Sequence, residues 1–144
     1  MRLRKAVILS MLFGIAIGTA GTLAAQGAPA RSHVKNLLQV ALAEEFTPGR
    51  EVLVDFVDLP PNTALDRHWH PGEEFHYYLE GEAEIRIEGQ PAIIGKPGTV
   101  GHVPFRKRHQ AIAGKQGAKV VVFRIHTKGE PWRYLDHADS TKRQ

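Results

Sequence analysis

The segment 67–74, RHWHPGEE, constrains this chain more than any other. It places His68 and His70 two positions apart, and side chains two apart on a β-strand point to the same face of a sheet. The Pro71-Gly72 pair is a turn signal, and a turn there brings Glu74 back toward the two imidazoles. Two imidazole nitrogens and a carboxylate oxygen suit a divalent transition metal. The segment therefore predicts a metal site, although it does not name a reaction.

The composition limits what can surround such a site. The 144 residues suffice for one domain with a real core. The chain has 14 Gly and 9 Pro among many short apolar runs, which favours an all-β fold. It has no cysteine, so a metal must be held by His, Asp or Glu. The formal net charge of +4 includes the three residues Arg2, Arg4 and Lys5. The remainder is nearly neutral and shows no electrostatic footprint of a nucleic-acid-binding protein, so no nucleic-acid partner is expected.

Residues 1–25 read as an export signal. A basic start precedes an apolar run over residues 6–25, and small residues close it near Ala25. A periplasmic or secreted protein is the simplest expectation. The alternative is a membrane protein anchored by residues 6–25, because the run is long enough to span a bilayer. Residues 26–33 read as a linker.

Residues 34–127 predict a barrel of short strands. Between 82 and 88, Ala83, Ile85 and Ile87 alternate with charged residues, as in a half-exposed strand. A type II turn is expected at 60–63, with Asn62 at the position that needs positive φ. The expected strands are 34–43, 51–59, 75–80, 82–88, 92–94, 99–103, 110–113 and 119–127. Short strands with frequent turns indicate an all-β barrel or double-sheet jelly roll, followed by a polar tail over 128–144.

Two spaced motifs in this region resemble those of the cupin superfamily. The first has the form G-x5-H-x-H-x3-E-x6-G, and the second has the form G-x5-P-x-G-x2-H-x3-N. Every spacing is kept in this chain. The first motif falls on Asn62, His68, His70, Glu74 and Gly81, and the second on Gly98, Pro104, Arg106, His109 and Ala113. The chain departs from the pattern at Asn62, Arg106 and Ala113, and none of these changes removes a ligand position.

The resemblance implies a double-stranded β-helix barrel with one divalent metal ion inside its mouth. It implies four ligands, which are His68, His70, Glu74 and His109. It also implies a homodimer, because members of the superfamily often form one. The metal could be Fe, Mn, Ni, Cu or Zn, because supply and folding compartment usually decide its identity.

Other residues near these motifs have two readings each. His76 and Tyr78 share strand parity with Glu74, so we expect them inside the barrel, as a general acid or base or as interior packing. His102 is expected to support a ligand or to fill the core. Arg106, in a basic run over 106–108, either binds a carboxylate or phosphate at the mouth or is a solvated loop residue.

These features lead to two functional hypotheses. The first is a metal-dependent enzyme of the oxygenase (dioxygenase-like) or isomerase type, acting on a small and possibly anionic organic molecule. The second is a non-catalytic module that binds a metal or a small ligand. The sequence does not separate them. Glu73 is expected to face solvent or to support a ligand, and His33, His126 and His137 receive no role.

Overall fold

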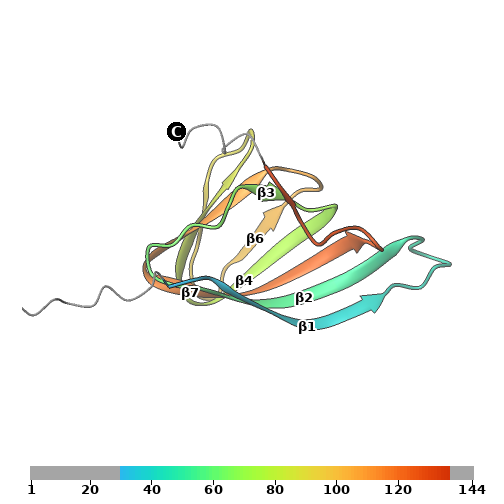
Figure 1. Ribbon diagram of the computed structural model, residues 1–144, viewed down its shortest axis with the longest axis horizontal. Helices are drawn as coiled ribbons and strands as arrows, with labels where there is room; N and C mark the ends of the chain where they lie inside the picture. The colour runs from blue at the N-terminus through green and yellow to red at the C-terminus, as the bar shows by residue number, and fades with distance from the viewer. Residues whose placement is uncertain (1–29, 137–144) are drawn as a thin grey trace, which may run out of the picture.

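The computed structural model describes residues 30–136, and every regular element in this range is a β-strand (Figure 1). The all-β expectation is therefore confirmed, while the export segment 1–25 lies outside the described residues. Within the described range, no helix is long and apolar enough to cross a membrane. The strands are β1 His33–Ala41, β2 Arg50–Leu59, β3 His68–Trp69, β4 Gly72–Ile87, β5 Ile93–Gly95, β6 Val100–Val103, β7 His109–Thr127 and β8 Tyr134–Leu135.

All pairings between these strands are antiparallel, and they form one curled sheet. The order β1-β2-β7-β3-β8 gives its main path, and β4 pairs with β5, β6 and β7. In Figure 1 the long strands β1, β2 and β7 lie side by side, and β4, β6 and β3 curve over them. The curled sheet is consistent with a cupin barrel, and its interior holds the predicted metal-binding residues.

Strands β4 and β7 are longer than the sequence predicts. The predicted strands 75–80 and 82–88 form one strand that ends at Ile87, and the predicted strands 110–113 and 119–127 also form one strand. The predicted breaks are bends, where Gly81 and Gly117 both have positive φ (65° and 77°). A Cβ atom on Gly81 would lie 2.0 Å from the carbonyl oxygen of Gly117. Only glycine allows the two strands to bend together at this point while their pairing continues.

The alternation on β4 determines which side chains form the core. Ala83, Ile85 and Ile87 are buried, as the alternation predicts. They pack against inward-facing residues of β2 and β7, among them Val57 and Val122. The predicted turn at 60–63 is also present, because Asn62 has a φ of 56° and the Thr63 amide donates to the Pro60 carbonyl.

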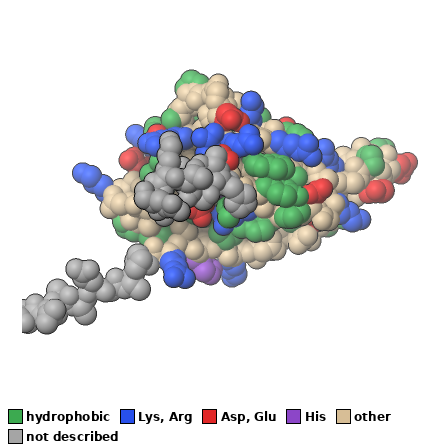
Figure 2. Space-filling view, turned by 45° about the horizontal axis from the view of Figure 1, so that its top comes forward, with side chains coloured by type: hydrophobic (Ala, Val, Ile, Leu, Met, Phe, Trp, Pro, Cys, Tyr) green, Lys and Arg blue, Asp and Glu red, His purple; other side chains and the backbone are tan. Residues whose placement is uncertain are grey.

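The opposite side of the sheet carries a second set of apolar residues, which we call the outer apolar face. Two rows cross the strands in register, one from Leu38 to Phe75 and one from Phe56 to Val100. Several members are strongly exposed, with Leu38 and Tyr77 at 48% and Val100 at 67%. The face comprises Leu38, Val54, Phe123, Phe75, Phe56, Val121, Tyr77 and Val100. Figure 2 shows one view of the surface, where hydrophobic side chains gather beside a row of Lys and Arg.

Candidate metal centre

Three predicted ligands, His68, His70 and His109, come together at one end of the barrel interior. Their ligand nitrogens lie within 4.8 Å of one another, and all three side chains are buried. His68 on β3 is directly opposite His109, the first residue of β7, in the antiparallel register. His70 follows β3 by one residue and shares the parity of His68. The spacing of two and the pairing of β3 with β7 therefore bring the imidazoles together.

Hydrogen bonds to the backbone determine which ring nitrogen of each histidine carries the proton. Nδ1 of His68 lies 2.6 Å from the Asp66 carbonyl oxygen, and Nδ1 of His109 lies 3.0 Å from that of Lys107. Nδ1 of His70 bonds to the carbonyl oxygen of Trp132. A carbonyl oxygen can only accept, so each Nδ1 donates and each Nε2 keeps its lone pair. This is the form in which an imidazole binds a metal.

The lone pairs of two histidines face a carboxylate rather than a donor. Nε2 of His70 and Nε2 of His109 are buried and have no hydrogen-bond partner. They lie 2.9 Å and 3.3 Å from the two carboxylate oxygens of Glu74. Acceptors this close repel one another unless a proton or a cation lies between them. The donor set therefore fits a divalent metal ion, with His70, His109, His68 and Glu74 as the residues that would hold it.

The charge states of these groups are also those of metal ligands. Burial, together with the neighbouring His109 and His70, lowers the pKa of His68 to about 3. Burial likewise lowers the pKa of His70, although Glu74 acts to raise it. For Glu74 itself, burial acts to raise the pKa, but the positive charge of Arg124, the largest opposing influence, holds it well below its usual range. These shifts favour neutral imidazoles on His68 and His70 and a charged carboxylate on Glu74 near neutral pH.

Arg124 contributes to the site, and the sequence reasoning did not identify it. It is 3% exposed and stands opposite Glu74 in the register between β4 and β7. Its Nε donates to Glu74 at 2.5 Å, and its Nη1 donates to the buried carboxylate of Asp55. The sequence signal for this role was an arginine two positions after Val122, on the side of β7 that faces the interior. It pairs with both buried carboxylates, and its positive charge helps to hold the pKa of Glu74 well below its usual range.

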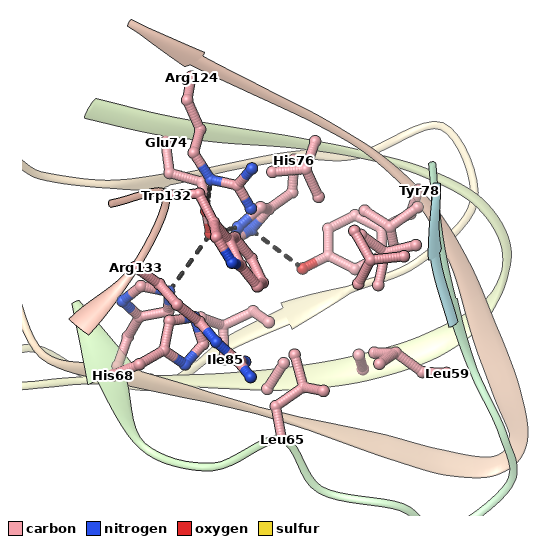
Figure 3. Close-up of a pocket in the computed structure, with 17 residues that line it drawn as sticks. Leu59, Leu65, His68, Glu74, His76, Tyr78, Ile85, Arg124, Trp132 and Arg133 are labelled. Carbon is pink, nitrogen blue, oxygen red and sulfur yellow. Dashed lines mark hydrogen bonds and ion pairs between the residues drawn. The ribbon is translucent and has the colours of Figure 1, made fainter. Parts of the chain in front are cut away.

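His76 and Tyr78 both face the interior, as their parity predicts. Nε2 of His76 lies 2.5 Å from Glu74, and its Nδ1 lies 3.5 Å from the Tyr78 hydroxyl (Figure 3). Because the carboxylate accepts, Nε2 of His76 donates and Nδ1 accepts from the phenol. Burial, with the charge of Glu74, raises the pKa of Tyr78 well above its usual range. The phenol therefore keeps its proton at neutral pH.

These groups line one cavity of about 50 Å³. His68, His109 and Glu74 lie at one end, and apolar side chains including Leu59, Leu65 and Ile85 line the rest. Trp132 and Arg133, from the connection before β8, also line it. In Figure 3 the Arg133 side chain extends toward Ile85 and Leu65. The cavity thus combines a polar, metal-binding end with an apolar body.

Arg106 does not line this cavity. It is exposed, has a φ of 58°, and places its guanidinium over the rings of Trp69 and Phe105. Arg133 lines the cavity instead, is half-buried, and makes no ion pair within residues 30–136. Burial lowers the pKa of Arg133, although Asp66 acts to raise it. An anionic ligand in the cavity would therefore meet Arg133 and not Arg106.

The expectation for His102 is wrong. His102 is exposed on the outer side of β6, where it pairs with Glu73 and stacks on Phe75. It neither fills the core nor contacts a predicted ligand. The reason is parity, because Gly101 and Val103 take the buried positions of this short strand. Glu73 lies on the same outer side, in agreement with the expectation that it faces solvent.

Comparisons with known proteins agree with this geometry. A family profile described as "Cupin domain" matches residues 55–125. A search by sequence among curated proteins finds no match. Among solved structures, the DMSP lyase DddQ from Ruegeria pomeroyi has a TM-score of 0.62 at 21% identity, over 76% of this chain and 53% of that chain. This chain therefore spans about half the length of that protein.

Two further structures have a similar fold. A cupin-like protein from Thermotoga maritima has a TM-score of 0.55 at 22% identity, over 76% of this chain and 80% of that one. A recombinant oxalate oxidase in complex with glycolate has a TM-score of 0.57 at 22% identity, over 76% and 57%. At these identities the likeness concerns the fold. Together with the profile match and the histidine cluster, it supports one assignment: the chain belongs to the cupin superfamily.

Proposed function

We propose that this protein is a metal-dependent enzyme that acts on a small organic molecule. The observation that carries the proposal is the pair of buried imidazole lone pairs, on His70 and His109, facing the carboxylate of Glu74. A bound divalent metal would polarise a substrate oxygen or support oxygen chemistry at this point. An oxygenase or isomerase type of reaction suits such a centre. Fe, Mn, Ni, Cu and Zn are all compatible with three imidazoles and a carboxylate.

The residues of this chain supply proton-handling groups beside the metal position. His76 holds a proton on Nε2 toward Glu74, and Tyr78 holds one on its hydroxyl toward His76. Both side chains line the cavity. A substrate there lies within reach of a phenol donor whose proton is retained at neutral pH. His76 and Tyr78 are therefore our candidates for the acid–base groups.

Arg133 indicates which charge the ligand should carry. Its half-buried guanidinium lines the cavity without an ion-pair partner among the described residues. A carboxylate or phosphate would neutralise it with charge-assisted hydrogen bonds. The apolar walls around Leu59 and Ile85 would contact the remainder of a small ligand. We therefore propose a small anionic substrate.

Metal analysis followed by turnover assays tests the proposal. The purified protein should carry about one transition metal ion per chain, and loaded protein should turn over a member of a panel of small acids, catechols and flavonoids, with oxygen uptake recorded. A protein that takes up no metal would refute the metal centre. Bound metal without turnover on any panel member would favour the alternative, a non-catalytic module that binds a metal or a small ligand.

We also propose that two copies of the chain pair through the outer apolar face. Its two rows of apolar side chains cross four strands, about 15 Å at the usual strand spacing. Soluble monomers seldom leave so continuous an apolar patch in water, and a stable interface needs about 800 Å² from each partner. A homodimer would cover Tyr77, Phe123 and Val100.

Export to the periplasm, or secretion, is likewise a proposal, and mass analysis of the mature N-terminus tests it.

A further inference from the structure

A second pocket lies between the inner sides of β1 and β2, the end of β7 and the connection to β8. It encloses about 460 Å³, and its polar lining includes Glu51, Gln39 and His126. Trp132 and Val34 line both this pocket and the metal-binding cavity, so they lie between the two. None of the predicted metal ligands lines it. We call it the Glu51 pocket.

His126 has a buried nitrogen without a partner in this pocket. Its side chain is fully buried, and Nε2 lies 3.3 Å from the carbonyl oxygen of Pro131. That contact places the proton on Nε2, so Nδ1 keeps its lone pair. Nδ1 has no hydrogen-bond partner and lies 3.4 Å from a carboxylate oxygen of Glu51. Two acceptors therefore lie side by side with no donor between them.

Glu51 is a buried carboxylate without a cationic partner among the described residues. It is only 7% exposed, and within residues 30–136 no Lys or Arg pairs with it. Its one neutral donor is the amide of Gln39 at 2.9 Å. The nearby carboxylate of Asp55 differs, because Arg124 pairs with it. A buried and unpaired carboxylate is costly, and a cation in the pocket would remove that cost.

We propose that the Glu51 pocket binds a primary organic ammonium ion. Its N–H groups would donate to Glu51 and to Nδ1 of His126, and so satisfy both acceptors at once. Val34, Leu53 and Trp132 would contact its alkyl part. Glu130, exposed at the pocket edge, adds a second negative charge. An apolar wall beside a buried acceptor pair suits an alkylammonium better than a bare metal ion.

Titration of the full-length chain with n-butylammonium tests this site. A Trp69→Phe background leaves Trp132 as the reporter, because the chain has two tryptophans. Glu51→Gln should weaken binding at least about tenfold, since it removes a charge-assisted hydrogen bond. The new amide can donate to Nδ1 of His126, so the fold should persist. Glu130→Gln should weaken binding about twofold, and Glu84→Gln, an exposed carboxylate elsewhere on β4, should leave it unchanged.

Two further probes, one neutral and one inorganic, complete the experiment. Butanol, which has the same alkyl chain without the charge, and MgCl2 should each bind at least about tenfold more weakly than butylammonium. Equal binding of butanol, equal binding of Mg²⁺, or unchanged affinity in Glu51→Gln would overturn the proposal. ¹⁵N NMR of the free protein should show His126 as the neutral Nε2–H tautomer. An imidazolium at neutral pH would also overturn it, because His126 would then supply the cation itself.

Discussion

Replacing Arg124 with methionine removes the positive charge shared by two buried carboxylates. Glu74 and Asp55 are 4% and 6% exposed, and Arg124 is the arginine that pairs with both. Breaking a buried ion pair by removing one partner costs about 3–5 kcal/mol, because the remaining charge has no compensation. We therefore expect the free energy of unfolding of the metal-free protein to fall by about that amount.

Arg86→Met is the matched control. Arg86 also pairs with a glutamate, Glu84, at 2.7 Å, but on the exposed side of β4. Solvent screens exposed pairs, which contribute little to stability, so the control should lose little stability. Urea unfolding in the presence of a chelator, followed by tryptophan fluorescence, measures both variants. A loss below about 1 kcal/mol for Arg124→Met would refute the reasoning.

The pH dependence of this difference has a definite sign. In the parent protein the pKa of Glu74 lies well below its usual 4.5. A depressed pKa contributes stability that is present above the unfolded value and is lost as pH falls through the folded value. Without Arg124, burial raises that pKa, so the variant loses stability as pH rises. The gap between the two proteins should therefore be large at pH 7 and should shrink below about pH 4.5.

Three further predictions concern the proposed functions. His70→Ala should abolish stoichiometric metal binding, measured by elemental analysis, while circular dichroism still reports a β fold; His102→Ala, which alters an exposed histidine, should keep the metal. Arg133→Gln should weaken binding of a small carboxylate to the metal-loaded protein about tenfold in calorimetry, whereas Arg106→Gly should leave it unchanged. If Arg106→Gly weakens binding and Arg133→Gln does not, Arg106 is the anion-binding residue. Phe123→Asp should convert a dimer into a monomer in light scattering, and an unchanged mass would exclude the outer apolar face as the interface.

The spacing of the sequence predicts most of the interior of the barrel. Side chains alternate on each side of the Gly81 bend, where the register of β4 shifts. The positions of His76 and Tyr78 before the bend, and of Ile85 and Ile87 after it, therefore follow from parity within each segment. The convergence of His68 and His109 follows from two spaced motifs. Their pairing depends on contacts between β3 and β7, which the motif implies but single-strand periodicity does not.

Other features depend on long-range pairing and could not be predicted in the same way. Gly81 and Gly117 resemble strand ends in a sequence, because a bend and a break use the same residue. Arg124 can be recognised as a site residue only once it is known that its side of β7 faces the barrel interior. Trp132 reaches the cavity because β8 pairs with β3, and a two-residue strand leaves no periodic signal.

The peptide segment Pro131-Trp132 has a consequence for both pockets. The carbonyl oxygen of Pro131 accepts from His126, and that of Trp132 accepts from His70. Adjacent carbonyls thus orient one imidazole in the Glu51 pocket and one in the predicted metal-binding cluster of His68, His70 and His109. A cation that displaces this segment in one pocket changes the orientation of the histidine in the other. Because such coupling is reciprocal, an amine that alters metal affinity by a given factor must have its own affinity altered by metal to the same extent.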